Sequence, residues 1–540
     1  MKRRHIYSIC WGLLALFFAS SCSDNVDYVV PFPDMEINIP GLETTYFYGE
    51  PLDLMPSVQY GESELNDFSV NWYLEQNNNR VLISDQPRLS YVFNTLGDFT
   101  IYCEVTNNET TVVTSIAENI SVRNHSYRGW YVLKETEDGN TDMDGFFSGS
   151  DTPVYNIAEL NLGHALAGTP KALIVSPRYM VPDTVISYAW GGTDPVRTEA
   201  VIPFSEHDGF VFDPNSSTTL ATKADLFRLT PESANGTVVG ASFSSTRITL
   251  AMDNGAYSML NGNSFFFPAM DGDYRLDGHF TVGSSGNSLA FDEKYNRFVL
   301  IGGGYTTTDQ ISYFTDAYHA VLNNGLEVPV NNMTGNLVFL ENANLNYAYS
   351  ANYVYALMRE PGENNSIRLL GMDYAGLIRS RNYTYDFYPG DYSPVTMDRT
   401  LNAAEMPMLV GADLFTMNKT VPVMYFANNG RVGSYNIQSG AYNESFITDI
   451  PAGEEITFMK YLVGEYSDDW GVPPGFEGLM VATYNASTGS YHIYRYWLEG
   501  LTTASRDEKV MSGTGKVSKV VYVHGGGNYT WSGDLYLYYN

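Results

Sequence analysis

Residues 423–437 read VMYFANNGRVGSYNI, and the same design returns at 248–260 (ITLAMDNGAYSML) and 479–494 (LMVATYNASTGSYHIY). In each stretch an apolar run meets a short turn of Asn, Asp, Ser or Gly, and a second run rich in aromatic residues follows. Asn-Gly between alternating apolar residues is the strongest short-range sign of a β-hairpin. The region 126–540 is therefore predicted to be built from hairpins.

Two further copies carry triple glycine, at 302–304 and 525–527. Gly-rich loops can cradle phosphate when a helix follows them. Residues 305–308 (YTTT) do not resemble the start of a helix, and the acidic chain disfavours phosphate. We interpret both triplets as turns.

The spacing of the hairpins indicates a repeated sheet. Tips are expected near residues 139, 181, 255, 303, 362, 430, 489 and 528. A four-stranded sheet that returns about every 40 to 70 residues is typical of a β-propeller. We predict a propeller-like domain over 126–540 with about seven blades, six to eight being possible. The strand at 535–539 is expected to pair with the blade that begins at 130–133 and to close the ring.

Residues 35–123 carry shorter strands in a different pattern. Alternate residues of 70–74 (VNWYL) and 99–105 (FTIYCEV) are apolar, as in half-buried strands. About seven short strands around a strand with a central Trp suggest an immunoglobulin-like sandwich. Cys103 is expected to be a buried core residue opposite Trp72 rather than a reactive thiol, because its neighbours on that face are apolar.

The core and turn positions of this domain resemble a polycystic-kidney-disease (PKD) repeat. They are Trp72, Phe93, Gly97, Phe99, Cys103, Val105 and Asn107. Residues 35–123 more closely resemble the PKD-like domain of Bacteroidetes lipoproteins, and the likeness extends loosely through the rest of the chain. The resemblance implies a long β region after the domain, and genes beside outer-membrane nutrient import systems.

The first residues are typical of an export signal. Residues 2–4 are basic, 6–18 are largely apolar, and small residues precede Cys22. The apolar core is shorter than the about 20 residues of a membrane-spanning helix. The small residues before the Cys resemble a bacterial lipobox. Residues 1–21 are therefore predicted to be removed, and Cys22 to carry palmitate-type acyl chains that hold the protein on a membrane.

The predicted mature chain starts with a short linker, 22–34. Residues 23–25 (SDN) resemble the tag that follows the lipidated Cys in Bacteroidetes surface lipoproteins. This favours the outer membrane and the cell surface. The alternative is an ordinary signal peptide with a chance Cys.

The charge and the cysteine count limit the possible partners. Without residues 1–21 the chain keeps 27 Lys and Arg against 61 Asp and Glu, a formal charge of −34. Nucleic-acid binding needs a basic surface and is not expected. The charge is compatible with neutral ligands, basic peptides or Ca²⁺. Beyond residue 22, Cys103 is the one remaining cysteine, so neither an internal disulfide nor a Cys-based metal site is expected.

One acidic loop resembles the start of a calcium-binding loop, which places oxygen ligands at alternate positions before a Gly. The candidate ligands are Asp138, Asn140, Asp142, Asp144 and, twelfth when counted from Asn140, Asp151. Asn stands where the first Asp is usual, Asp stands for the last Glu, and no flanking helices are evident. The alternative is an acidic hairpin with an Asp-Gly turn.

A second candidate site is aromatic, because exposed rings beside amides and carboxylates suit sugars and peptides alike. Its residues are Tyr383, Tyr385, Tyr388, Tyr392, Trp470 and Phe476. The alternative is that these rings fill the space between blades.

No catalytic signature is present in the sequence. The Gly-x-Ser-x-Gly and His-Glu-x-x-His motifs are absent, and the His residues are scattered. We therefore predict a cell-surface lipoprotein with a non-catalytic binding or accessory role, in glycan or peptide capture beside an outer-membrane import system. Two alternatives stay open. One is a glycan-degrading enzyme with paired carboxylates in a central cleft, and the other is a structural partner of an outer-membrane transport complex.

Overall fold

The chain forms two compact units, Met1–Val122 and Arg123–Asn540. A computed structural model describes residues 33–47, 51–76, 79–93, 95, 97–123, 129–147, 152–187, 193–244, 247–282, 288–302, 310–313, 320–321, 327–328, 330–346, 350–373, 395–463, 477–500, 503–507 and 510–523. Within these ranges no helix is long and apolar enough to span a membrane.

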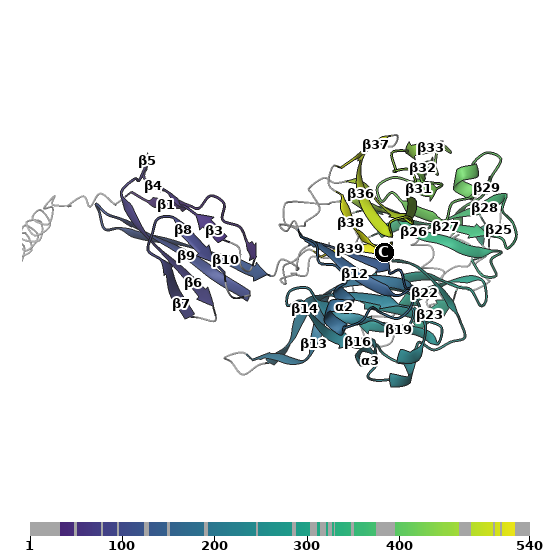
Figure 1. Ribbon diagram of the computed structural model, residues 1–540, viewed down its shortest axis with the longest axis horizontal. Helices are drawn as coiled ribbons and strands as arrows, with labels where there is room; N and C mark the ends of the chain where they lie inside the picture. The colour runs from purple at the N-terminus through teal and green to yellow at the C-terminus, as the bar shows by residue number, and fades with distance from the viewer. Residues whose placement is uncertain are drawn as a thin grey trace, which may run out of the picture. The chain divides into compact units, whose positions relative to one another are not determined.

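The first unit consists of antiparallel strands (Figure 1). They are β1 (Met35–Asn38), β2 (Thr45–Phe47), β3 (Pro51–Leu54), β4 (Ser57–Tyr60), β5 (Ser63–Glu64), β6 (Phe68–Gln76), β7 (Asn79–Ser84), β8 (Leu89–Val92), β9 (Gly97–Asn107) and β10 (Val113–Arg123). Their sheets run in the orders β1-β4-β5, β2-β10-β9-β6-β7 and β3-β8. Alternate residues of β6 and β9 are buried, because successive side chains of a strand point to opposite faces.

The core of this unit centres on Trp72, whose side chain is fully buried and whose indole N–H donates to the Gln86 carbonyl at 3.2 Å. In the register of β6 and β9, Trp72 lies opposite Cys103. Cys103 is 1% exposed, and burial raises the pKa of its thiol to about 12. The prediction of a core cysteine opposite Trp72 is confirmed.

The second unit contains seven larger sheets among its described residues. The first three are β39-β11-β12 (Lys516–Val523, Gly129–Glu135, Thr141–Phe147), β13-β14-β15-β16 (Pro170–Ser187, Thr193–Ser205, Phe210–Asp213, Thr218–Thr222) and β17-β18-β19 (Val238–Ser244, Arg247–Met252, Gly255–Leu260). The next two are β20-β21-β22-β23 (Leu276–Val282, Ser288–Asp292, Arg297–Gly302, Gln310–Tyr313) and β26-β27-β28-β29 (Asn336–Asn346, Ser350–Arg359, Ser366–Asp373, Val395–Asn402). The last two are β30-β31-β32-β33 (Leu414–Met417, Val423–Asn428, Arg431–Asn436, Tyr442–Ile447) and β34-β35-β36-β37 (Glu455–Val463, Glu477–Asn485, Ser490–Glu499, Thr503–Arg506).

Smaller elements complete the unit. They are β38 (Met511–Thr514), which pairs with β36, the hairpin β24 (Ala320–Val321) and β25 (Glu327–Val328), and the short helices α2 (Ile157–Leu162), α3 (Lys223–Leu226), η2 (Pro231–Asn235) and α5 (Pro407–Val410).

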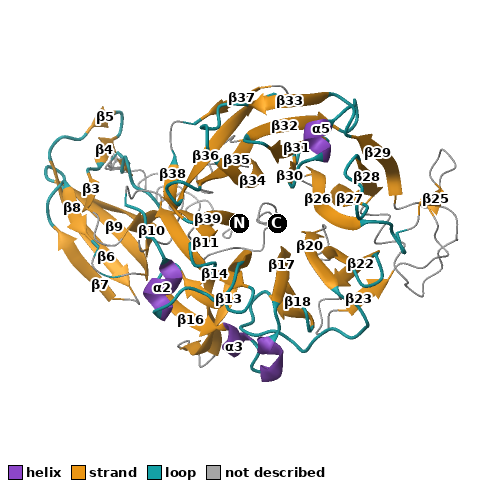
Figure 2. Ribbon diagram, turned by 45° about the vertical axis from the view of Figure 1, so that its right-hand side comes forward, coloured by secondary structure: helices purple, strands orange, loops and turns teal. Residues whose placement is uncertain are grey.

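The seven sheets close into a ring. The first strand of each sheet contacts the first strand of the next, in the order β13, β17, β20, β26, β30, β34 and β39, and β39 contacts β13 again. Figure 2 shows the sheets arranged around a common centre. This is a propeller-like architecture with seven blades among the described residues. Each inner strand is the first strand of its sheet and is hydrogen-bonded to one neighbour within that sheet.

The first and the last described strands of this unit meet within a single sheet. β39 pairs with β11 from Gly129↔Val523 to Glu135↔Lys516, and β11 pairs with β12 along its other edge. Closure by the two ends was expected from the sequence, but the closing segment is 516–523. The predicted pairing of 535–539 with the blade that begins at 130–133 stays a prediction. Residues 535–539 lie outside the described residues.

The hairpin at 423–437 has the turn that its sequence predicts. Asn428 pairs with Arg431, and the two residues between them, Asn429 and Gly430, have φ of 51° and 69°. Positive φ at both positions is the conformation that favours Asn-Gly in a two-residue hairpin loop.

The tip expected near residue 181 is wrong. β13 continues to Ser187, and its pairing with β14 shifts register between Ser176 and Tyr179 and again between Met180 and Val185. These irregularities accommodate Pro182, which has no N–H to give to the ladder, without ending the strand.

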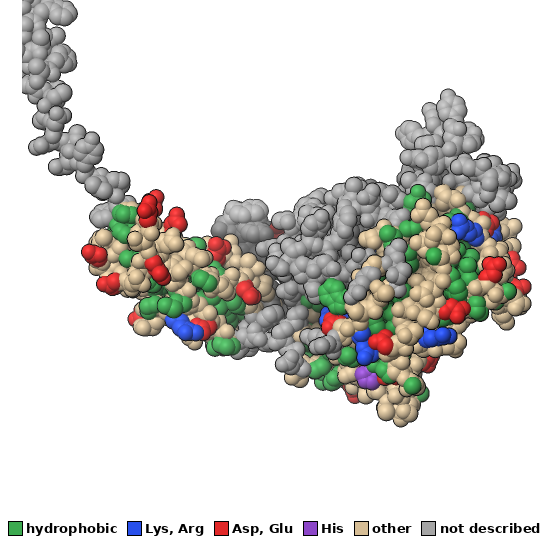
Figure 3. Space-filling view, turned by 90° about the horizontal axis from the view of Figure 1, so that it is seen from above, with side chains coloured by type: hydrophobic (Ala, Val, Ile, Leu, Met, Phe, Trp, Pro, Cys, Tyr) green, Lys and Arg blue, Asp and Glu red, His purple; other side chains and the backbone are tan. Residues whose placement is uncertain are grey.

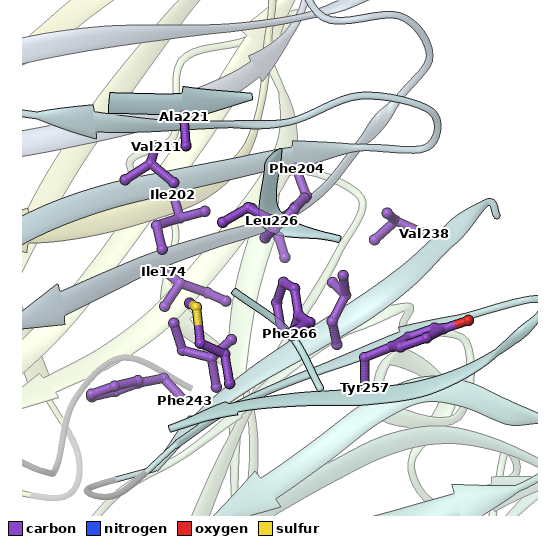
Figure 4. Close-up of a cluster of buried hydrophobic side chains, with 14 of the residues drawn as sticks. Ile174, Ile202, Phe204, Val211, Ala221, Leu226, Val238, Phe243, Tyr257 and Phe266 are labelled. Atoms are coloured by element: carbon purple, nitrogen blue, oxygen red, sulfur yellow. The ribbon is translucent and has the colours of Figure 1, made fainter. Parts of the chain in front are cut away.

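Each pair of neighbouring sheets encloses an apolar core. Figure 4 shows one core in which Ile174, Ile202 and Phe204 of the second sheet meet Val238 and Tyr257 of the third. On the other side of the second sheet, Val521 of β39 joins a core with residues of β11, β13, β14 and β15. The closing sheet is thus held by packing as well as by its hydrogen bonds.

We expect Val521→Asp to destabilise the ring by about 3 kcal/mol or more, because Val521 is 3% exposed and a buried carboxylate there has no partner. Thermal unfolding followed by circular dichroism measures the change. Lys516→Gln, on the same strand but with an accessible side chain, is the control and should melt like the wild type. Equal melting of Val521→Asp and wild type contradicts the role assigned to β39.

Candidate functional site

The acidic loop predicted to bind calcium lies at the hairpin of β11 and β12. Asp138 is exposed in the turn, whereas Asp142 and Asp144 are buried in β12. Asp142 accepts hydrogen bonds from the backbone N–H groups of Met143 (2.7 Å), Ala158 (2.8 Å) and Glu159 (3.3 Å). Two of these donors open helix α2, so this carboxylate caps the helix. Burial raises the pKa of Asp142, and the three hydrogen bonds oppose that rise.

Asp144 is engaged with three other groups. Its oxygens lie 2.7 and 2.8 Å from the ammonium of Lys134, and they accept hydrogen bonds from the Asn156 N–H (2.9 Å) and the Tyr491 hydroxyl (2.7 Å). Lys134 and Asp144 are almost fully buried, and Tyr491 belongs to the preceding blade. The pair therefore joins the closing sheet to that blade.

The described part of the loop thus serves the fold. The side-chain oxygen of Asn140 accepts from the Gly168 N–H at 3.3 Å. Within the ranges that the structure describes, no group of three or more His, Cys, Asp or Glu is placed to hold a metal ion. The fifth ligand, Asp151, lies outside the described residues, so the calcium site stays a prediction.

The other predicted site residues also lie outside the described residues. They are Cys22, Tyr383, Tyr385, Tyr388, Tyr392, Trp470 and Phe476.

A hollow of about 750 Å³ opens at one end of the ring. The first residues of the inner strands β13, β30, β34 and β39 border it, together with the end of β11 and the turn between β31 and β32. Because four inner strands begin here, the hollow lies at a mouth of the ring, and we call it the mouth pocket. Its volume is that of an ordinary small-ligand site.

The mouth pocket is acidic. Its charged lining residues are Glu135, Asp413, Glu454, Glu455 and Lys516. The Asp413 side chain is 87% exposed and 3.4 Å from Arg359, while Glu455 lies 3.4 Å from Lys516. These accessible pairs are weak, so the carboxylates remain available to a ligand.

Glu454 has a structural role within this wall. Its carboxylate is buried, accepts hydrogen bonds from the hydroxyls of Thr483 and Tyr494, and lies 3.0 Å from a ring nitrogen of His492. Burial, followed by the nearby Glu454 charge, raises the pKa of Tyr494 to about 12. Glu454 therefore fixes the start of β34 rather than facing a ligand.

A second polar cluster lies on the inner strands. Glu341 of β26 receives hydrogen bonds at one oxygen, Oε1, from the ammonium groups of Lys419 (2.5 Å) and Lys460 (2.7 Å). Its other oxygen accepts from the Met417 N–H at 2.9 Å. Glu341 thereby connects three consecutive blades, because Lys419 follows β30 and Lys460 lies on β34.

The charges in this cluster strongly affect one another. Burial alone raises the pKa of Glu341, but the two ammonium groups outweigh burial and bring it from 4.5 to about 2. Burial lowers the pKa of Lys419 from 10.5 to about 8, although Glu341 opposes that change. Glu341 is thus a carboxylate throughout the neutral range.

Neither the mouth pocket nor the Glu341 cluster could be predicted from local sequence patterns. The mouth pocket is assembled from several segments that are far apart in the chain, and each supplies one or two ordinary polar residues. Glu341 is the one acidic residue in the largely apolar run LVFLENANL (337–345). This isolated charge is the one sequence signal that could have predicted a buried carboxylate in a strand. Its lysine partners are not near it in sequence.

No known family model and no curated protein matches the chain. Among solved structures, a quinonprotein alcohol dehydrogenase-like protein from Bacteroides thetaiotaomicron is 12% identical, with a TM-score of 0.34 over 91% of this chain and 99% of its own. Dihydro-heme d1 dehydrogenase NirN is 10% identical, with a TM-score of 0.34 over 73% of this chain and 75% of its own. PorZ, a surface component of the type-IX secretion system of Porphyromonas gingivalis, is 11% identical, with a TM-score of 0.19 over 87% of this chain and 65% of its own. At these TM-scores the likenesses carry no argument, and the ring rests on the strand contacts of this chain.

We expect Glu341→Gln to cost about 3–5 kcal/mol at neutral pH, because Lys419 and Lys460 lose the carboxylate that both of them share. The folded-state pKa of Glu341 is lowered from 4.5 to about 2, so its stabilisation is present above about pH 4.5 and is lost as the pH falls toward 2. The difference in melting temperature between wild type and variant should therefore shrink over that pH range.

Glu232→Gln is the matched control, since Glu232 is exposed in η2. It should melt like the wild type at every pH. A Glu341→Gln difference that stays constant from pH 6 to pH 2 argues against the lowered pKa.

Proposed function

We propose that this protein is an exported, lipid-anchored, non-catalytic binding protein of the cell surface, which captures its ligand at the mouth of the ring. The mouth pocket is the observation that carries the proposal. Its walls are the starts of inner strands held in a closed ring, so its shape is fixed before a ligand arrives. A preformed site of this kind loses little conformational entropy when a ligand binds.

The lining suits ligands that donate hydrogen bonds or carry positive charge. Carboxylates of Asp413 and Glu455 face accessible space, and the turn at Asn428–Gly430 adds amide and backbone groups. Sugar hydroxyls and the basic side chains of a peptide both match such a surface. On the face seen in Figure 3, acidic side chains are spread over the described surface, in keeping with a formal charge of −31. That charge disfavours polyanionic partners.

The first unit is proposed to be a PKD-like, immunoglobulin-type sandwich. Its described strands share a core built on Trp72 and Cys103, at positions where the sequence resembles that family. In this proposal the unit follows the anchored Cys22 and links the membrane to the binding body. The resemblance also favours a role together with an outer-membrane nutrient import system.

Cys22→Ser should release the protein from the membrane, because an acyl-thioether anchor requires the cysteine sulfur. Fractionation of bacterial cells, with metabolic labelling by a palmitate analogue, measures both anchoring and lipid. Cys103→Ser is a control that keeps the signal intact and should remain labelled and membrane-bound. A Cys22→Ser protein that still takes up label contradicts the anchor.

The binding proposal is tested with glycan and peptide arrays probed with residues 23–540, with and without Ca²⁺. We expect saturable binding without product formation. Asp413→Asn combined with Glu455→Gln should weaken it about tenfold or more, since each substitution removes a charge that strengthens a hydrogen bond. Glu232→Gln is the control for net charge and should bind like the wild type.

The alternatives give different outcomes in the same assay. Product release from a glycan supports an enzyme. Arrays that stay blank, together with co-purification of an outer-membrane protein, support a structural partner. Loss of binding when Ca²⁺ is removed would support the predicted site at Asp138, Asn140, Asp142, Asp144 and Asp151.

A further inference from the structure

A lysine and an asparagine carboxamide from neighbouring blades lie in contact beside a buried carboxylate. Lys419 follows β30, whereas Glu341 and Asn342 lie on β26, and these two inner strands contact each other. The ammonium of Lys419 donates to Glu341 Oε1 at 2.5 Å, to the Asn342 carbonyl at 2.8 Å and to the side-chain oxygen of Asn342 at 3.1 Å. Because a carbonyl carbon lies about 1.2 Å from its oxygen, the carboxamide carbon of Asn342 is within roughly 4.3 Å of the lysine nitrogen. A nucleophile, an acyl group and a proton carrier therefore meet at one point.

The chain holds these groups in place. Asn418 is 1% exposed, and its side-chain oxygen accepts from the Thr420 N–H at 2.8 Å, which fixes the turn that carries Lys419. On the opposite strand, the second oxygen of Glu341 accepts from the Met417 N–H at 2.9 Å. Groups that are already positioned do not have to be ordered before they react.

The surroundings favour the reactive form of the lysine. The side chains of Lys419 and Glu341 are 4% and 7% exposed, so bulk water is largely excluded from the contact. Burial lowers the pKa of Lys419 to about 8, although Glu341 opposes that change. Part of this lysine is therefore a neutral amine near neutral pH, and the neutral amine is the form that attacks a carbonyl carbon.

We propose that Lys419 and Asn342 join in an isopeptide bond between two neighbouring blades. Nζ of Lys419 attacks Cγ of Asn342, the bond from Cγ to Nδ2 breaks, and Nδ2 leaves as ammonia. Glu341 takes the proton that the lysine nitrogen loses and passes it to the departing nitrogen. The product is a secondary amide, and no oxidant, reductant or other reactant takes part. The side chains described above are in the state that precedes this reaction.

The bond gives the ring a second means of closure. The seam between β39 and β11 is held by hydrogen bonds and packing, whereas the isopeptide bond would tie the blade of β26 to the blade of β30 covalently. In the linked form Glu341 keeps Lys460 as its ion pair. The bond shares no residue with the mouth pocket and does not depend on the proposed capture of glycans or peptides.

The test is mass spectrometry of residues 23–540, both intact and after digestion with trypsin in denaturant. We expect the intact mass to be lower than that of the sequence by one ammonia molecule. Trypsin cuts after Lys and Arg but not after a lysine whose side chain is acylated. Peptide 298–359 should therefore be recovered joined to 400–431. Recovery of 298–359 and 400–419 as separate peptides, with the full intact mass, overturns the proposal.

Four variants assign the roles of the individual side chains. Lys419→Arg keeps the charge but has no nucleophilic amine, and Asn342→Ser has no acyl group, so both should show the full mass. Glu341→Gln keeps both reacting groups without the proton carrier, and linking should slow about a hundredfold or more. Lys460→Arg changes the other partner of Glu341 and should link like the wild type. Near-UV circular dichroism confirms that each variant is folded, and a linked peptide in Lys419→Arg or Asn342→Ser contradicts the assignment.

Discussion

The pairing of β39 with β11 is the constraint on which the second unit depends. Without it, the inner strand of the closing sheet would be missing, and β11 would expose a row of unpaired backbone groups. With it, each sheet has a neighbour on both sides and every inner strand has a fixed place. Val521 packs toward one neighbouring blade and Val517 toward the other. The Lys134–Asp144 pair and the Tyr491 hydroxyl add a polar link between blades. The mouth pocket and the cluster of Glu341, Lys419 and Lys460 owe their geometry to this closure.

Charge is distributed unevenly within the ring. Carboxylates gather at the mouth, where four inner strands begin, whereas the ammonium groups of Lys419 and Lys460 lie on Glu341, away from the mouth pocket. Glu455 and Lys460 lie five residues apart on β34. Along an extended strand this separation corresponds to roughly 16 Å. The acidic mouth pocket and the Glu341 cluster are therefore distinct polar regions of the inner strands.

Local features of the fold were predictable from sequence, because they follow from short-range chemistry. Asn429-Gly430 predicts its own turn, and the alternation around Trp72 and Cys103 predicts two facing strands. Closure of the ring was expected, but the part that 516–523 takes in it was not, because nothing local distinguishes this strand from the other apolar strands of the chain. An acidic stretch does not reveal that Asp142 caps a helix and that Asp144 pairs with a lysine, so neither role could be predicted. Glu341, Lys419 and Lys460 come from distant parts of the chain and meet only because the ring closes.

The seam of the ring also sets an order of events during folding. β11 ends at Glu135, and its inner partner does not begin until Lys516, so most of the chain must be made before the last sheet can form. Contacts between such distant segments form slowly, and a synthesised chain delivers its amino-terminal part first. Until the last strand arrives, six blades stand beside an incomplete seventh whose free edge can pair with another chain. Until then, the free edge of β11 must be kept from pairing with another chain. The pairing of β39 with β11 covers that edge and ends the risk.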